Sequence, residues 1–169
     1  MYQALLLKDE IEKLLHREAD YCDNWQLNDW LGLWAEGEVL YEVGPLDTPN
    51  GEQYSHKDVL FLVSDNRFRL EQRVVRMGKS TAHAEYPVRS RLRHIYGNMR
   101  DIEHHGDEVS LRVNMLVSRT RRDTEGVSIL PGYAIFRLVR HDGGLRIREK
   151  RVFLDLHVLA NPGTMSIIV

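Results

Sequence analysis

Apolar residues in the first third of the chain recur at a helical period. Leu7, Ile11, Leu14 and Leu15 fall on one stripe, and Cys22 continues it. Because residues three and four positions apart share one face of a helix, this stripe predicts an amphipathic first helix.

A second apolar stripe follows and predicts a second helix. It consists of Leu27, Trp30, Leu31 and Trp34. Asp23 or Asn24 can cap the start of this helix by accepting a backbone N–H, and Gly37 is placed to end it. The stripe itself is most simply interpreted as core.

A strand and a long loop separate these helices from a third. The segment EVLYEV indicates a strand, whereas residues 44–57 contain two Pro, two Gly and almost no apolar side chains, which predicts a loop. A loop of this length is usually functional or held by a partner. Ser64 or Asp65 can cap the third helix, and Gly78 can end it. Its apolar face would consist of Leu70, Val74 and Met77.

The remainder alternates between apolar and polar residues, as strands do. Residues 108–121 form one such segment, GYAIFRLVRH a second and, after a tight DGG turn, LRIREKRVFLDLHVL a third. In the last segment the apolar set starts at Leu145 and Ile147 and continues at Val152 and Leu154. This change of phase predicts a β-bulge or a strong bend, because alternation cannot otherwise change face.

The order of these elements predicts the fold class. Helices followed by long antiparallel strands indicate an α+β fold in which a curved sheet wraps over the helices. No repeat, low-complexity tract or linker interrupts the chain, and 169 residues suit one core. We therefore expect a single domain over residues 1–169.

Charge and cysteine content narrow the classes of function. A formal net charge of -2 supplies no global field that would draw the chain to nucleic acid or to an anionic membrane. A single cysteine, Cys22, excludes an internal disulfide and any cysteine-based metal or iron–sulfur site built by this chain alone. The run MYQALLLKDEIEKLL has too few consecutive apolar residues for a signal peptide or a membrane span. We expect a cytoplasmic protein that binds neither nucleic acid nor membrane.

Basic residues concentrate in YPVRSRLRHIYGNMRD, residues 86–101. Arg89, Arg91 and Arg93 alternate along an expected strand, and His94 follows. An anion site, a catalytic pocket and a subunit interface would each explain this pattern, and so would solvated charges on an outer sheet face. Of the 23 basic residues 18 are Arg, which is enriched at protein interfaces, so assembly is favoured. The acidic strand REKRVFLD suggests Arg–carboxylate pairs between subunits.

The histidines offer two patterns. His104 and His105 in EHHGDE indicate a hairpin turn rather than a metal site, because adjacent strand residues point to opposite faces. His94 can be a general base oriented by Asp29 or Asp155, or it can be packed at a subunit contact. No phosphate loop, His-Glu-x-x-His or Gly-x-Ser-x-Gly motif selects the catalytic interpretation. The pocket around such a base would be lined by Tyr41, Tyr96 or Trp30.

Several long stretches keep a characteristic order and spacing. They are HREADYCDNWQLNDWLGLWAEGEVLYEV, DNRFRLEQRVVRMGKSTAHAEYPVRSRLRHIYGNM, VSLRVNMLVSRTRRD, and LRIREKRVFLDLHVL with TMSIIV. The second contains a Ser-Arg-x-Arg-His core at Ser90 to His94. In this combination, over almost its whole length, the chain resembles the β (small) subunit of bacterial aromatic-ring-hydroxylating dioxygenases.

The resemblance implies the cone-like α+β fold of the nuclear transport factor 2 (cystatin-like) superfamily and an α3β3 assembly. The partner α subunit would carry a Rieske 2Fe-2S centre and a mononuclear Fe(II), supplied with electrons from NADH through ferredoxin and reductase components. The β subunit would form a trimer with its own copies, hold no metal or cofactor, and be non-catalytic. The complex would add both atoms of O2 to an aromatic ring. The implied subunit contacts are Arg91, Arg93, His94, Arg119, Arg151 and Asp155.

A stand-alone enzyme of the same superfamily is the alternative. A dehydratase, isomerase or cyclase of this fold would use His94 with Asp29 and Tyr41 in a pocket inside the cone. The two interpretations differ in one observable feature, since the enzyme needs an open pocket with ionisable groups of shifted pKa, whereas the subunit can fill its cone with side chains.

Overall fold

The computed structural model describes residues 2–81, 85–122, 125–159 and 166–169. It contains the helices α1 (Tyr2–Asp23), α2 (Leu27–Leu31) and α3 (Arg67–Met77), and a short 3-10 helix η1 (Gly51–Gln53). The strands are β1 (Leu40–Val43), β2 (Val63–Asp65), β3 (Arg91–His105), β4 (Glu108–Thr120), β5 (Ser128–His141) and β6 (Gly144–Leu154). The fold is α+β, as the sequence predicts.

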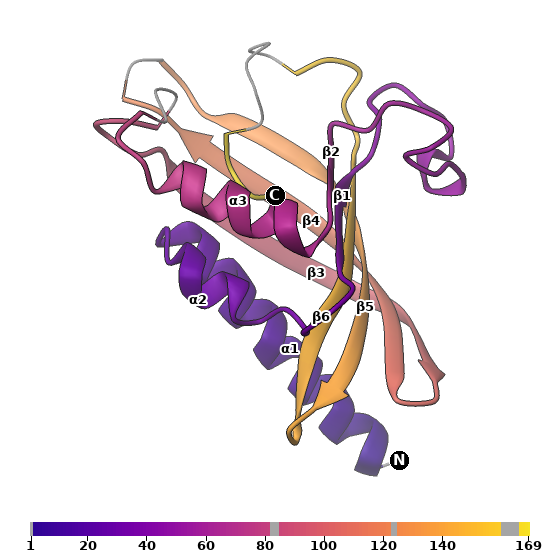
Figure 1. Cartoon of the computed structure of the whole chain (residues 1–169). Helices are drawn as coiled ribbons and strands as arrows, with labels where there is room; N and C mark the ends of the chain where they lie inside the picture. The colour runs from indigo at the N-terminus through magenta and orange to yellow at the C-terminus, as the bar shows by residue number, and fades with distance from the viewer. Residues whose placement is uncertain (1, 82–84, 123–124, 160–165) are drawn as a thin grey trace.

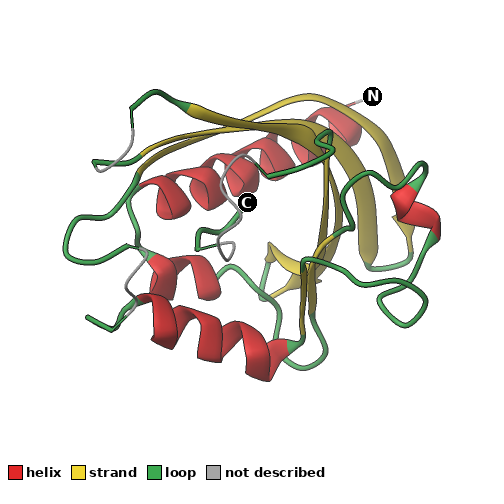
Figure 2. Cartoon of the chain, turned by 90° about the horizontal axis from the view of Figure 1, so that it is seen from above, coloured by secondary structure: helices red, strands yellow, loops and turns green. Residues whose placement is uncertain are grey.

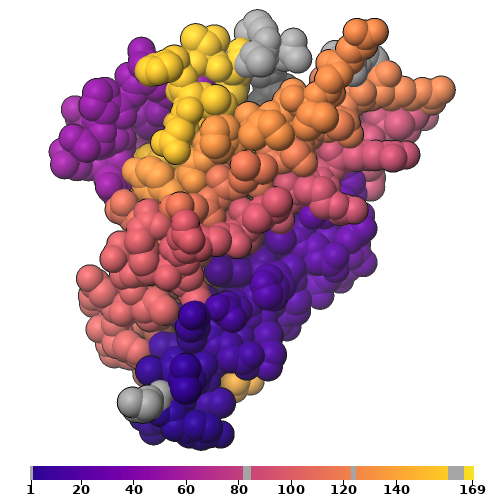
Figure 3. Space-filling model, turned by 180° about the vertical axis from the view of Figure 1, so that it is seen from behind, coloured from indigo at the N-terminus to yellow at the C-terminus, as the bar shows by residue number. Residues whose placement is uncertain are grey.

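One sheet of six strands, in the order β2-β1-β6-β5-β4-β3, curves around the helices (Figure 1). β1 runs parallel to β6, and the other neighbouring strands are antiparallel. Figure 2 shows the helices on the concave side, with the end of the chain in the space between helices and sheet. From behind, β3, β4 and β5 form a continuous surface beside α1 (Figure 3).

The first helix buries the predicted stripe. Leu7, Ile11, Leu14, Leu15 and Cys22 are all buried against the sheet. A charged residue, Glu18, lies on the same face and is fully buried. The periodicity therefore located the helix but did not identify the polar group at its centre.

The second helix is shorter than predicted. It ends at Leu31 with Gly32 as its C-cap, and Gln26 precedes it without a side-chain capping bond, so the expected caps at Asp23 or Asn24 and at Gly37 are wrong. The cause is a long-range backbone pairing that local periodicity cannot show. The Ile147 N–H donates to the carbonyl of Leu33, and the Ala35 N–H donates to the carbonyl of Ile147, so this segment joins β6 instead of the helix.

The third helix has the predicted face and end, but a different cap. Its buried residues are Leu70, Val74 and Met77, and Gly78 is the C-cap. The N-cap is Asn66, whose side chain accepts the Arg69 N–H at 3.0 Å. Ser64 and Asp65 cannot fill this role because they belong to β2.

The turns and the bulge are confirmed. Gly106 (φ 67°) lies in the β3–β4 turn and Gly143 (φ 77°) in the β5–β6 turn, in left-handed conformations that suit glycine. Opposite Arg137 and Leu138, β6 contributes Glu149 and Ile147, so one residue is inserted between them. This bulge produces the change of phase seen in the sequence.

Among the described residues, bulky side chains and the last residues of the chain pack together inside the cone. Trp30, Trp34 and Tyr41 pack edge to face, with ring centroids 5.5–6.2 Å apart. Residues 167–169 are buried beside them. The Tyr41 hydroxyl donates to the carbonyl of Val169 (3.2 Å) and accepts its N–H (3.1 Å).

Candidate functional site

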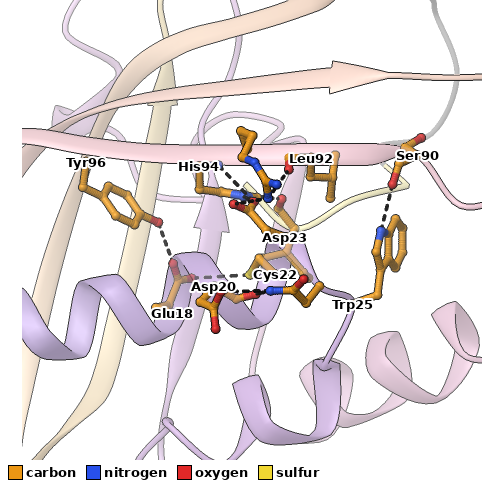
Figure 4. A network of polar contacts seen from close by, with 12 residues as sticks. Glu18, Asp20, Cys22, Asp23, Trp25, Ser90, Leu92, His94 and Tyr96 are labelled. Carbon is orange, nitrogen blue, oxygen red and sulfur yellow. Dashed lines mark hydrogen bonds and ion pairs between the residues drawn. The ribbon is translucent and has the colours of Figure 1, made fainter.

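His94 is held on both sides by the chain itself. Its side chain has no exposed surface, Nδ1 lies 2.7 Å from Asp23 Oδ1, and Nε2 lies 3.0 Å from the carbonyl oxygen of Ile168. The His94 backbone N–H also donates to Asp23 Oδ1 at 3.0 Å (Figure 4). Because both ring nitrogens face acceptors, the two bonds coexist only when the ring carries both protons.

The residues expected to accompany His94 in an active site do not gather around it. The carboxylate that orients the ring is Asp23, and not the predicted Asp29 or Asp155. Asp29 is exposed on α2, Asp155 is exposed after β6, and Tyr41 binds the backbone of Val169. This arrangement leaves the imidazole no free nitrogen with which to take a substrate proton.

A second buried centre is formed by Glu18. Its Oε1 accepts from Trp30 Nε1 at 2.8 Å and from Lys150 Nζ at 2.7 Å, and its Oε2 accepts from the Tyr96 hydroxyl at 2.7 Å. The Glu18 and Lys150 side chains are 0% exposed. The Lys150 ammonium also lies 5.6 Å from the Tyr96 ring centroid and 5.7 Å from that of Phe136, within the range of cation–π attraction.

Burial and charge act in opposite directions on Glu18. Burial alone would raise the pKa of this carboxyl, but the ammonium of Lys150, the His94 ring and the hydrogen bonds from Lys150 and Trp30 outweigh it and hold the pKa below its ordinary value. Burial and the negative charge of Glu18 raise the pKa of the Tyr96 hydroxyl and that of the Cys22 thiol. The centre is therefore an ionised carboxylate surrounded by donors, which suits a structural role.

Three surface clefts, of about 570, 500 and 270 Å³, lie away from this centre. None is lined by Glu18, Lys150, Tyr96 or His94. Within the part of the chain that the structure describes, no three His, Cys, Asp or Glu side chains converge as metal ligands. His104 and His105 end β3 beside its turn and are exposed, in agreement with the turn interpretation. No described helix is both long and apolar enough to cross a bilayer.

Two of the arginines predicted at subunit contacts bind groups of their own chain. Arg119 forms an ion pair with Glu85, and its guanidinium also donates to Ser90 Oγ at 2.9 Å and to Ser166 Oγ at 2.8 Å. Arg151 Nε donates to Glu42 Oε2 at 2.9 Å. Both side chains are largely covered, with exposed fractions of 17% and 22%.

The other two arginines face outward. Arg91 is exposed at the start of β3, and Arg93, with a side chain 72% exposed, has Asp23 Oδ2 at 3.5 Å. Of the six predicted contact residues, Arg91, Arg93 and Asp155 are exposed, whereas His94 is buried. Their contact with another subunit stays a prediction.

Glu42 connects the long loop to the sheet. Besides Arg151, it accepts from Ser64 Oγ at 3.3 Å and lies 2.7 Å from His56 Nδ1. Arg151 also donates to the Tyr54 carbonyl at 3.1 Å. Residues 44–57 are thus anchored through β1 and β6.

The comparisons with known proteins agree with this structure. An NTF2-like protein with a cystatin-like fold from Novosphingobium aromaticivorans matches with a TM-score of 0.60 at 18% identity, over 90% of this chain and 84% of that chain. A chain of naphthalene 1,2-dioxygenase, in a structure with indole bound in the active site, matches with a TM-score of 0.80 at 18% identity, over 97% and 86% of the two chains. These matches define the fold as an NTF2-like cone.

Sequence comparison defines the family. Residues 17–161 match the family described as "Ring hydroxylating beta subunit". The small oxygenase component of the p-cumate 2,3-dioxygenase system of Pseudomonas putida is 40% identical over 168 residues, which cover 99% of this chain and 90% of that protein. The chain belongs to the family of ring-hydroxylating dioxygenase β subunits.

Proposed function

We propose that this chain is the structural, non-catalytic subunit of a cytoplasmic aromatic-ring dioxygenase, and that residues 1–169 act as one domain within an α3β3 assembly. The observation that carries this proposal is that the chain's own C-terminal residues occupy the polar groups inside the cone. His94 and Tyr41, the groups that an enzyme of this fold would use, are bound to Ile168 and Val169 of the same chain. A subunit that acts in assembly binds its partners through its outer surface, so the interior of its cone can be packed with side chains.

The iron chemistry belongs, under this proposal, to the large subunit. That subunit would hold a Rieske 2Fe-2S centre and a mononuclear Fe(II), supplied from NADH through ferredoxin and reductase components. The irons would supply O2 activation for addition of both oxygen atoms to the ring. The contribution of this chain would be to position the large subunits.

The six predicted contact residues divide into two roles. Arg91, Arg93 and Asp155 are exposed and would meet neighbouring subunits directly. The remaining three, His94, Arg119 and Arg151, would keep β3, β4 and β6 in the shape that those contacts need. Charged pairs of this kind fix register and partner choice more than they add affinity.

The p-cumate relative suggests which substrate to test first. Its name supports an aromatic carboxylate as the first substrate to test with the assembled complex. Naphthalene, a ring system without a carboxylate, is the natural comparison compound, because a naphthalene dioxygenase shares the fold.

The decisive experiment is co-expression with a large oxygenase subunit from the same organism. The mass of the purified complex should fit three copies of each subunit, and its iron should be retained by the large subunit alone. Once NADH and the ferredoxin and reductase components are added as the source of electrons, the complex should consume O2 with p-cumate. A chain that stays a monomer or dimer and recruits no iron protein would contradict the proposal. His94 would then become the first residue to mutate in a search for independent activity.

A further inference from the structure

A groove of about 500 Å³ lies between the segment that enters β3 and the end of β4. Of the six described residues that line it, four are arginines and none is acidic. In a chain with a net charge of -2, this is a local concentration of positive charge rather than part of a general field. The lining residues are Val88, Arg89, Arg91, Thr120, Arg121 and Arg122.

The two chain segments that form the arginine groove are joined through Ser90, a buried residue between Arg89 and Arg91 in the sequence. Its N–H donates to Glu85 Oε2 at 2.7 Å, and its Oγ accepts from Arg119 Nε at 2.9 Å. Since Arg119 belongs to β4 and Ser90 precedes β3, these bonds connect the two walls. The groove is therefore held in shape without any ligand.

Trp25 contacts Arg89, the first arginine of the groove. Its indole N–H donates to the Ser90 carbonyl at 3.0 Å (Figure 4), and its ring lies 5.2 Å from the Arg89 guanidinium carbon. The Arg89 side chain, held against the Trp25 ring, loses less conformational entropy when it binds a ligand, and the strand register places Arg91 next to Thr120 on the other wall.

The chemistry of the lining selects the ligand. Planar guanidinium groups bind carboxylates and phosphates through two parallel hydrogen bonds. Val88, which lines the groove, and Tyr86, two residues before it, are exposed hydrophobic side chains. Arginine next to exposed aromatic and aliphatic surface is typical of protein contacts, whereas the chain lacks the overall positive field that polyphosphates would favour.

We propose that the arginine groove binds a carboxylate-rich segment of a protein partner. Under the function proposed above, on which this identification of the partner rests, that partner is the large oxygenase subunit. Arg89 and Arg91 bind its carboxylates, and Ser90, Glu85 and Arg119 keep the groove in shape.

The probe for the groove itself is the peptide acetyl-hexaglutamate amide, titrated calorimetrically into the purified chain. The double variant R89Q/R91Q should weaken binding by about tenfold or more, because two charge-assisted contacts are removed. The control R100Q/R140Q removes the same charge from exposed arginines that do not line the groove, and should weaken binding by less than about twofold. Circular dichroism melting of both variants verifies that the fold is retained.

Several outcomes would overturn the proposal. One is absence of peptide binding by the unaltered chain, and another is equal weakening in the control, which would indicate attraction by net charge alone. Displacement of the peptide by inorganic pyrophosphate at much lower concentration would identify a phosphate site instead.

The second arm separates this proposal from the proposed function. R89Q/R91Q co-expressed with the large subunit should retain less of it in a salt wash than the unaltered chain does, and equal retention would refute the large subunit as the partner. If the unaltered chain binds the peptide selectively but recruits no large subunit, the proposed function fails while the groove remains a carboxylate site.

Discussion

The carboxylate of Glu18 and the ammonium of Lys150 lie 2.7 Å apart, and neither side chain has any exposed surface. They join the middle of α1 to β6 across 132 residues of sequence. Around them, the donors Trp30 and Tyr96 satisfy the other positions of the carboxylate. In the alternative enzyme such a pair would mark the pocket, but here it lies within the core.

Removal of one partner of this pair should be costly. Lys150→Met leaves the Glu18 carboxylate buried without its counter-charge, so we expect the free energy of unfolding to fall by about 3–5 kcal/mol. Urea unfolding of the isolated chain measures this difference. Glu18→Gln combined with Lys150→Met removes both charges, and should recover a substantial part of the loss. A double variant no better than the single one would show that the charge imbalance is not the cause.

The same centre gives stability a defined dependence on pH. The pKa of Glu18 is lowered in the folded state, because the donors around it outweigh the effect of burial. A carboxyl of lowered folded pKa stabilises the protein fully above its unfolded pKa, about 4.3, and this contribution is lost as the pH falls through the folded value. As the pH falls, the free energy of unfolding of the unaltered chain should therefore decrease more than that of the Glu18→Gln variant.

Urea midpoints of the two proteins between neutral and acidic pH test this sign. The difference between them should be constant near neutrality and should shrink below about pH 5. Growth of the difference on acidification would mean that burial dominates and that the folded pKa is raised.

Arg93→Ala should weaken assembly without affecting the fold. Its side chain is 72% exposed and forms an ion pair at 3.5 Å with Asp23, so the isolated chain should lose less than about 1 kcal/mol of stability. Sedimentation of the co-expressed complex should show more free subunits at low concentration, while the iron chemistry of the large subunit is unchanged. Arg100→Ala, an exposed arginine on the same strand, is the matched control. A complex that sediments as before would remove Arg93 from the interface.

The sequence predicted the elements whose stabilising contacts are periodic. The stripes of α1 and α3 and the alternation of β4 follow directly from burial on one face. The end of α2 could not be predicted in this way, because it is set by pairing of residues 33–35 with Ile147, far along the chain. Such long-range backbone hydrogen bonds override the local helix propensity.

The candidate site could also be predicted only in part from the sequence. His94 stood out because it follows alternating arginines, but its partner Asp23 is 71 residues away, and nothing local favours it over Asp29. Glu18 did carry a signal, since a charged residue on an apolar helical stripe is costly unless a partner is buried with it. Its partner Lys150 lies in β6, and only the fold brings the two together.

His94→Ala should affect stability rather than turnover. The variant removes the ring contacts to Asp23 and to the buried Ile168 carbonyl, while Asp23 keeps the backbone N–H of residue 94 and the Arg93 ion pair, so the free energy of unfolding should fall by about 1–3 kcal/mol. Complex that still assembles should oxidise substrate at the same rate per iron. A normal iron content with greatly reduced turnover would instead assign His94 a role near the reaction.

Gly132 in β5 should tolerate no side chain, although it lies in a strand where other residues would normally be favoured. A Cβ at this position would overlap the carbonyl oxygen of Phe153 and lie 3.0 Å from Leu154 Cα, both of which are backbone atoms of β6. Because β5 and β6 cannot separate without loss of their ladder, Gly132→Ala should destabilise the chain by about 1–3 kcal/mol. Gly97→Ala in β3 is the control, since a Cβ there meets nothing within 4 Å. Thermal melting of the two variants should separate them clearly, and equal melting temperatures would show that the β5–β6 contact can relax.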